Sequence, residues 1–149
     1  MAHDTYDRRI QLGASRRRRE DAEILHETGR WAGAIYVGGY AIECALKALI
    51  CCNSGKNNFK DTQAFQQGIR GNSLHNLTLL LGSISEVQRV IETDRTNTYK
   101  PAWSLIRQMW QKDELRYWDK VGNQQDSERF INALQLLHRF LLAQQGEAS

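Results

Sequence analysis

The 149-residue sequence contains a single proline, three cysteines and no apolar run long enough to cross a membrane. So little proline, among many Arg, Glu, Gln, Leu and Ala residues, argues against collagen, disorder and a turn-rich β-sandwich. The longest uncharged apolar stretch, residues 31–42, is far shorter than the roughly 20 residues of a transmembrane helix. The residues after Met1 are polar and charged, so we expect neither a signal peptide nor a membrane anchor.

The cysteines and histidines form no recognisable metal-binding or redox motif. The adjacent Cys51 and Cys52 are a poor disulfide pair, and Cys44 lies inside an apolar helical segment. The sequence also lacks a glycine-rich phosphate loop, a His-Glu-x-x-His motif and a nucleophile elbow. We therefore expect no metal ion and no cofactor, and the cysteine usage favours a reducing, cytoplasmic compartment.

Positive charge is concentrated in one place only. The net charge of +3 is small and the two signs are interspersed, which is too weak a pattern to indicate nucleic-acid binding by itself. The one basic run, residues 16–19, consists of four arginines and is followed at once by Glu20, Asp21 and Glu23. We interpret it as a solvated helix face with local ion pairs; contact with phosphate or with an acidic partner is the alternative.

Helical periodicity dominates the sequence, and no segment alternates with period two. The pattern predicts an all-α bundle of four to six helices in one domain, residues 15–145, after a lead-in over residues 1–14. We expect a polar connector at residues 53–73 with one helical turn near residues 62–67, and a charged loop at residues 112–125. The predicted helices cover residues 15–30, 31–52, 74–81, 84–91, 101–110 and 126–144.

The strongest predicted helix is residues 31–52. Apolar residues recur at helical spacing over most of its circumference, so we expect it to be the central helix of the core. Gly38 and Gly39 lower its helix propensity and would let another backbone come close. Its main apolar face consists of Trp31, Ile35, Gly38, Ile42, Ala45, Leu46 and Leu49.

A polar stripe runs along the opposite side of this helix. Tyr36, Tyr40, Glu43 and Lys47 have i, i+4, i+7 and i+11 spacing, and the last two form an i, i+4 ion pair in the favourable order. One interpretation is a solvated seam, in which such a pair contributes only a few tenths of a kcal/mol. The other is a polar groove or a subunit contact. The periodicity leaves both open.

Capping residues predict where later helices begin. Asn72 or Ser73 would cap the helix that follows them. Ser83–Glu86 resembles a capping box, and Pro101 suits the first position of the next helix. These starts place His75 in the first turn of its helix, where free N–H groups and the helix dipole favour an anion.

His75 is the histidine whose surroundings suggest chemistry. It would either hydrogen-bond a ligand or accept a proton, or else fix the connector to the helical core. Arg70 lies five residues before it, and an arginine that binds phosphate beside a histidine that moves a proton is the minimum for RNA cleavage. Arg70 and His75 are therefore the candidate catalytic residues. We interpret His138, on the last helix, as a residue at the core boundary rather than a base.

Three segments, Ala41–Leu49, Leu74–Leu81 and Leu115–Tyr117, resemble in this order elements of the HEPN family (higher eukaryotes and prokaryotes nucleotide-binding domains). Ala41–Leu49 is similar to the family's Ala-x-Glu-x-x-Leu-Lys-Ala-Leu helix. Leu74–Leu81 resembles its His-Asp-Leu-x-x-Leu-Leu element, with Asn76 in place of the usual aspartate. Leu115–Tyr117 resembles the Arg-Tyr element before the last long helix, with Trp118 where a proline is common. The resemblance covers nearly the whole predicted domain.

The resemblance implies an up-and-down bundle of about five helices that usually dimerises. Some family members are ribonucleases of toxin–antitoxin or defence systems, with an Arg-x(4–6)-His motif usually next to the last helix. Others are thought to bind nucleotides or a partner nucleotidyltransferase. In this sequence the arginine that precedes His138 on the last helix is Arg129, which is too far from it for that motif. The residues implied to line a ligand cleft are Tyr40, Glu43, Lys47, His75, Arg116 and Tyr117.

The leading hypothesis is a cytoplasmic, non-catalytic HEPN-type domain that forms a homodimer and binds a nucleotide, RNA or a partner protein such as a nucleotidyltransferase. Lys47, Arg116 and Arg70 would meet phosphate, and Tyr40 or Tyr117 would stack on a base. One alternative is a metal-independent ribonuclease that uses the two candidate catalytic residues. Another is a purely structural helical dimerisation module. We expect RNA binding without cleavage.

Overall fold

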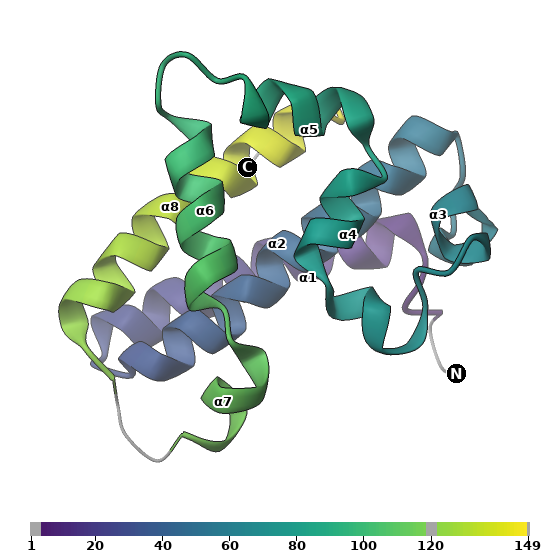
Figure 1. The fold of residues 1–149 in the computed structure, drawn as a ribbon. Coiled ribbons are helices and arrows are strands. Elements are labelled where there is room, and N and C mark those ends of the chain that lie inside the picture. Colours follow the sequence, from purple (N-terminus) through teal and green to yellow (C-terminus); the bar gives the residue numbers. More distant parts are fainter. Residues whose placement is uncertain (1–3, 119–121, 149) are drawn as a thin grey trace.

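The computed structural model describes residues 4–118 and 122–148, and the regular elements within these ranges are all helices (Figure 1). The predicted all-α class is therefore confirmed. An isolated β-bridge joins Asp7 and Asn58. The α-helices are α1 (Arg8–Glu27), α2 (Trp31–Ser54), α3 (Gln63–Gln66), α4 (Leu77–Gly82), α5 (Ser85–Glu92), α6 (Tyr99–Met109), α7 (Lys112–Tyr117) and α8 (Gln124–Ala143); the 3₁₀ helices are η1 (Phe59–Asp61) and η2 (Gly71–His75).

Helix α2 lies at the centre of the fold, as its apolar pattern predicted. Figure 1 shows α1 behind it and α4 and α6 in front of it, and α8 also packs against it. It begins at Trp31, as expected, and ends at Ser54, where Gly55 adopts a φ of 64° that closes the helix in the left-handed region. By length and composition α2 could cross a membrane, but 72% of its most apolar window is buried inside this fold.

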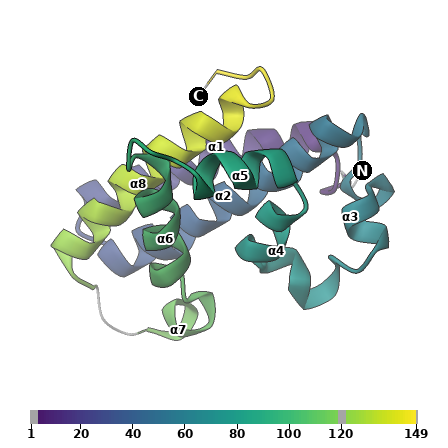
Figure 2. The same ribbon diagram turned by 45° about the horizontal axis from the view of Figure 1, so that its top comes forward.

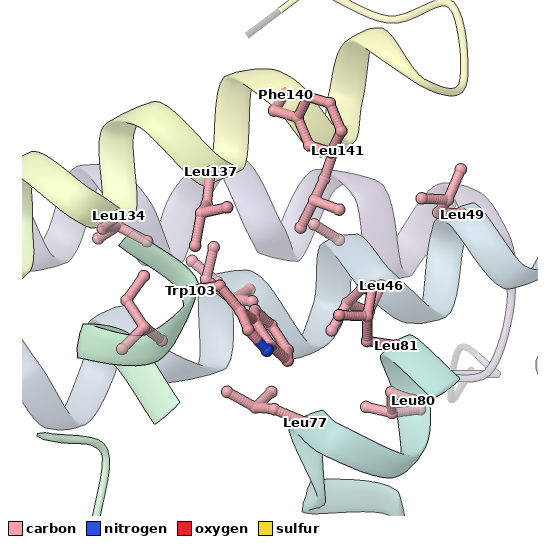
Figure 3. Close-up of a cluster of buried hydrophobic side chains, with 14 of the residues drawn as sticks. Leu46, Leu49, Leu77, Leu80, Leu81, Trp103, Leu134, Leu137, Phe140 and Leu141 are labelled. Atoms are coloured by element: carbon pink, nitrogen blue, oxygen red, sulfur yellow. The ribbon is translucent and has the colours of Figure 1, made fainter. Parts of the chain in front are cut away.

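Side chains from four helices meet at the centre of the apolar core. Figure 3 shows Leu46 of α2, Leu77 of α4, Trp103 of α6 and Leu137 of α8 pointing toward a common centre. Leu46 and Leu137 have no exposed surface, and Leu77 and Trp103 are 4% and 8% exposed. Full burial of a leucine side chain contributes roughly 1.5–3 kcal/mol. This centre therefore fixes helices that are far apart in the sequence, and Figure 2 shows α4 and α7 on one side of α2 and α8 on the other.

The two central glycines of α2 accommodate side chains, not another backbone. A Cβ on Gly38 would lie 2.7 Å from a ring carbon of Phe130. A Cβ on Gly39 would fall onto the indole of Trp110. The expected close backbone approach is therefore wrong. The glycines are needed because large aromatic rings from α8 and from the end of α6 lie directly on the α2 backbone.

Two helical segments extend beyond the predicted boundaries. Helix α1 begins at Arg8 rather than at Ser15, because the Asp7 side chain accepts a hydrogen bond from the Arg9 N–H and caps an earlier start. The expected lead-in over residues 1–14 is correspondingly shorter. Helix α7 occupies part of the segment predicted to be a loop, although residues 119–121 of that segment lie outside the described ranges.

The connector after α2 contains short helices that move the start of α4. Helix α3 matches the helical turn predicted near residues 62–67. The η2 turn occupies Gly71–His75, and the Asn76 side chain then accepts a hydrogen bond from the Leu79 N–H, so α4 begins at Leu77. The predicted cap at Asn72 or Ser73 is therefore wrong. His75 lies just before α4, not in its first turn.

Helices α5 and α6 also begin differently from the prediction. The Ser83 hydroxyl donates to the Leu80 carbonyl at 2.7 Å, and α5 has no side-chain cap, so the expected capping box does not form. Helix α6 begins at Tyr99, which places Pro101 third in the helix rather than first. Its cap is the Asp94 carboxylate, which accepts hydrogen bonds from the N–H groups of Thr98, Tyr99 and Lys100.

His138 lies inside the core and not at its boundary. Its side chain is fully buried, and its Nε2 atom is 3.1 Å from the Ser15 hydroxyl. Burial lowers the pKa of His138 to about 4, with smaller contributions from the Arg19 and Arg16 guanidinium groups. His138 is thus a neutral core residue at physiological pH, because a buried imidazolium beside two cations is strongly disfavoured.

Candidate functional site

A buried carboxylate lies in the polar stripe of α2. Glu43 is 4% exposed, and its two oxygens have different partners. Lys47 Nζ donates to Oε2 at 2.9 Å, and His75 Nδ1 lies 2.9 Å from Oε1. Lys47 is itself only 6% exposed. Buried charges persist when they are paired and hydrogen-bonded, so these three residues form one unit, which we call the Glu43 network.

The solvated-seam interpretation of the polar stripe is therefore wrong for Glu43 and Lys47. The chain returns after the connector and packs α4 against α2, and this contact brings His75 onto the Glu43 carboxylate. The i, i+4 spacing of Glu43 and Lys47 is the same whether the pair is exposed or buried, so the spacing could not distinguish the two interpretations. The expectation that Lys47 meets a ligand phosphate fails for the same reason, since its ammonium group is buried against Glu43.

An open cleft of about 280 Å³ lies beside His75. Its cationic residues are Arg107 from α6 and Lys112 from α7, and no carboxylate is among its lining residues. Within residues 4–118 and 122–148, neither cation has an acidic side chain at ion-pair distance. We call this space the basic cleft. It is lined by Asn72, His75, Asn76, Leu77, Thr78, Arg107, Trp110 and Lys112.

Aromatic rings connect the basic cleft to α2. The Trp110 indole donates from Nε1 to the Tyr36 carbonyl at 3.0 Å, which fixes the ring in the cleft wall. Tyr40 meets the Trp110 ring edge-on at a centroid distance of 5.0 Å and the His75 ring edge-on at 6.2 Å. Edge-to-face pairs contribute roughly 0.5–1.5 kcal/mol each. Tyr40 therefore has aromatic partners inside the protein in Tyr36, Trp110 and His75.

A second cationic group, Arg116, lies next to the tyrosine hydroxyls. The hydroxyls of Tyr36 and Tyr40 are 3.4 Å apart. Burial raises the pKa of Tyr40 to about 12, whereas the hydrogen bond with Tyr40, followed by the Arg116 guanidinium, lowers the pKa of Tyr36. The Arg116 guanidinium also lies 5.9 Å from the centre of the Tyr117 ring, which is 79% exposed.

The structure brings together some predicted site residues and separates others. Glu43, Lys47, His75 and Tyr40 are in contact around one point. Arg70 is exposed, is not among the residues that line the basic cleft, and precedes η2 as its capping position. The sequence analysis missed Arg107, Trp110 and Lys112 as cleft residues. Arg107 and Trp110 share a helical face, and this was the one feature of the sequence that could have pointed to them. The sequence does not show that this face lies opposite His75.

The Glu43 network sets the chemical state of His75. A carboxylate oxygen only accepts hydrogen bonds, so the His75 Nδ1 atom carries the proton of this contact. The His75 side chain is 39% exposed and lines the basic cleft. Its other ring nitrogen, Nε2, can therefore accept a proton when the ring is neutral, or donate to an anion when the ring is protonated.

Among the described residues, no group of three His, Cys, Asp or Glu side chains is arranged to hold a metal ion. Burial raises the pKa of the Cys44 thiol to about 12 and that of Cys51 to about 11, so neither is an activated nucleophile. The chemistry available at this site is thus that of the imidazole, the two cations and the aromatic wall.

Comparisons with protein families, with curated proteins and with solved structures found no match to this chain.

Proposed function

We propose that this chain is a HEPN-type domain that binds the phosphate group of a nucleotide or of RNA in the basic cleft. The observation that carries the proposal is the lining of that cleft, where Arg107, Lys112 and His75 converge without a carboxylate among them. Arginine and lysine form charge-assisted hydrogen bonds with phosphate, and a protonated His75 adds a third donor. The volume of about 280 Å³ leaves room for the group that carries the phosphate.

The arrangement of α7 supports a nucleotide over a bare anion. Lys112 of this helix lines the basic cleft, and Tyr117 lies five residues later, about 140° around the helix axis and outside the cleft lining. The Tyr117 ring is 79% exposed, so its face is available to a base, and aromatic stacking contributes about 1–3 kcal/mol per base. Arg116 would meet a second phosphate or a ribose hydroxyl beside Tyr36.

The three segments that carry the HEPN resemblance lie around one site. Glu43 and Lys47 from the first segment contact His75 from the second, and Arg116 from the third lies near Tyr36, one turn before the first segment. Such convergence supports an HEPN-like bundle built on α1, α2, α4, α6 and α8. The proposal includes a cytoplasmic location and a partner nucleotidyltransferase as the protein alternative to RNA.

Calorimetric titration with adenosine monophosphate, with a short 5′-phosphorylated single-stranded RNA and with inorganic phosphate tests the proposal. We expect Arg107→Ala and Lys112→Ala each to weaken binding of the phosphorylated ligands about tenfold or more, which corresponds to about 1.4 kcal/mol. Thermal unfolding of both variants should match the wild type, because both side chains lie outside the core.

The matched control is Arg70→Ala, which removes the same charge from an exposed position outside the cleft. Its affinity should equal that of the wild type. An equal loss in Arg70→Ala and Arg107→Ala would reduce the effect to general electrostatic attraction and would remove the cleft from the proposal. Binding of phosphate alone, without preference for the nucleotide, would remove the role of Tyr117.

A second candidate function, a metal-independent ribonuclease, is favoured by the hydrogen bond between His75 and Glu43. A carboxylate that fixes the tautomer of a histidine is a common feature of proton-transfer sites. In this version Arg107 and Lys112 replace Arg70 as the groups that stabilise the phosphate. Incubation with single-stranded RNA in the presence of chelator tests it: cleavage that falls about a hundredfold or more in His75→Ala supports the enzyme, and binding without cleavage supports the binder.

A further inference from the structure

The cations of the basic cleft differ from the arginine run of α1 in their acidic neighbours. In the run, Arg16 pairs with Glu147 at 3.3 Å, Arg18 with Asp21 at 2.9 Å, and Arg19 with Glu23 at 3.5 Å. These contacts support the interpretation of the run as a solvated face with local ion pairs. The lining of the basic cleft contains no carboxylate, so an anion that enters the cleft finds cations that are not already neutralised.

Asn76 occupies a cleft position where an acidic residue would serve equally well as a helix cap. It is exposed, lines the cleft and is the N-cap of α4, where its Oδ1 atom accepts a hydrogen bond from the Leu79 N–H at 3.1 Å. Asparagine and aspartate cap helices about equally well, and a carboxylate also interacts favourably with the helix dipole. Capping alone therefore does not account for a neutral residue at this position.

The cap hydrogen bond determines which side of the Asn76 amide remains available. A backbone N–H only donates, so the atom that contacts Leu79 is the amide oxygen, and the Nδ2 group keeps its two N–H donors. Among residues 4–118 and 122–148, no acceptor lies at hydrogen-bond distance from Nδ2. Asn76 therefore contributes free donors at the cleft, as Arg107 and Lys112 do.

A lining rich in donors matches a ligand group that only accepts hydrogen bonds. The terminal phosphate of a nucleotide, a monoester, has three free oxygens and carries a charge of about −1.5 to −2 at pH 7. Its charge matches the two permanent cations, Arg107 and Lys112. A phosphodiester inside a strand carries a single negative charge and has fewer free oxygens, so it uses this set of donors less completely.

We propose that the basic cleft is specific for a terminal phosphate and that Asn76 preserves this specificity, because it caps α4 without adding a negative charge. The inference rests on the proposed function, since it concerns the same cleft. Arg107 and Lys112 attract the dianion, and Asn76 places a neutral donor where an aspartate would repel it. When the ligand is RNA, the cleft then holds the phosphorylated end of a strand and not its interior.

Adenosine 5′-monophosphate and 3′,5′-cyclic adenosine monophosphate are matched probes for this specificity. They share the base and the ribose, and they differ in whether the phosphate is a monoester dianion or a diester monoanion. Calorimetric titration of the wild type at about pH 7.5 should show an affinity for the monoester about tenfold or more above that for the cyclic diester.

Asn76→Asp is the variant that tests the role of the neutral cap. It should lower the affinity for the monoester about tenfold or more and lower that for the cyclic diester less, because repulsion between like charges grows with the charge of the ligand. The preference for the monoester should therefore shrink. Thermal unfolding should occur at or above the temperature of the wild type, since aspartate caps a helix as well as asparagine does.

Two further variants separate the charge at this position from other effects. Asn123→Asp makes the same change at the N-cap of α8, where the exposed Asn123 side chain accepts from the Asp126 N–H and does not line the cleft; both affinities should equal those of the wild type. Asn76→Ser keeps a neutral cap and removes only the amide donors. It should lower both affinities by no more than about threefold and keep the preference for the monoester.

Failure of this inference and failure of the proposed function give different results. If the wild type binds both nucleotides equally and Arg107→Ala weakens both, the cleft holds phosphate without selecting its ester, and only the inference fails. It also fails if Asn76→Asp leaves the monoester affinity unchanged, or if Asn123→Asp lowers that affinity equally. If the wild type binds neither nucleotide nor the 5′-phosphorylated RNA, the proposed function fails and the inference fails with it.

Discussion

Two histidines in this molecule lie beside cations but differ in burial and in their hydrogen-bond partners. His138 is fully buried, its Nε2 atom is near only the Ser15 hydroxyl, and its pKa is lowered to about 4. His75 is 39% exposed, contacts the Glu43 carboxylate and opens onto the basic cleft. A carboxylate and a path to solvent allow His75 to carry positive charge toward an anion. His138 has neither and stays neutral.

This contrast separates a residue that stabilises the core from one that can do chemistry. Both histidines lie in helical, apolar surroundings, and both are single histidines in their segments. The difference comes from what packs against them. A buried carboxylate is costly to keep charged unless it has partners. Glu43 is therefore the residue on which the His75 site depends, and the predictions below test that dependence.

The largest effect is expected for Glu43→Ala. It leaves the Lys47 ammonium buried without its partner, and breaking a buried ion pair in this way typically costs about 3–5 kcal/mol. Chemical denaturation should show that loss of unfolding free energy. Glu43→Ala/Lys47→Met removes both charges and should recover most of it. A loss below about 1 kcal/mol in the single variant would mean that water reaches this pair.

The next effect concerns the pH dependence contributed by His138. The pKa of His138 in the folded protein, about 4, lies below the pKa of 6.5 of a histidine in the unfolded chain, so between these values the unfolded state binds more protons. The contribution of His138 to the free energy of unfolding is therefore fully present above pH 6.5. It is lost as the pH drops toward 4, by up to about 3 kcal/mol. The free energy of unfolding, measured by denaturation at several pH values in this range, should change less with pH in His138→Leu than in the wild type. An equal pH dependence in the two proteins would contradict the assignment.

Gly39→Ala tests whether the wall beside His75 depends on the position of Trp110. The added methyl group collides with the indole, and forced overpacking costs about 1–3 kcal/mol. Displacement of Trp110 should also weaken nucleotide binding, measured by calorimetry. Gly33→Ala is the matched control on the same helix: its nearest neighbour is 3.8 Å away, so the change should stabilise the protein by about 0.5–1 kcal/mol.

The smallest effect on stability is expected for His75→Gln. Glu43 keeps Lys47 as a partner, and the lost hydrogen bond is partly solvent-exposed, so we expect a change of about 1 kcal/mol. Affinity for the phosphorylated ligands, measured by calorimetry, should fall several-fold, because the variant removes the imidazole from the cleft wall. An unchanged affinity would contradict a direct role for His75.

Much of the fold was accessible from periodicity, but several helix starts were not. The apolar pattern of residues 31–52 predicted α2, and the stripe of the last helix predicted α8 at Gln124–Ala143. Helix starts were wrong where a cap came from an unexpected residue. Asp94 is the clearest case, because its carboxylate reaches three N–H groups several residues later in the sequence. Local sequence shows which residues can cap a helix but not which one will.

The candidate site was accessible only in part. The spacing of Glu43 and Lys47 marked a polar stripe, and His75 was selected as the histidine suited to chemistry. Arg107 and Lys112 were not selected, because each is an ordinary surface cation until α6 and α7 are placed opposite η2.

By itself, the sequence determined that the protein is all-helical, that α2 is its central helix and that a polar stripe runs along that helix. Hydrophobic periodicity specifies these features because it records which face of a helix avoids water. Only the tertiary structure decided that Glu43 is buried, that His75 contacts it from 32 residues away and that two cations face the resulting cleft. Those features depend on which segment returns to cover a given face, and that choice is made by packing among helices distant in the chain.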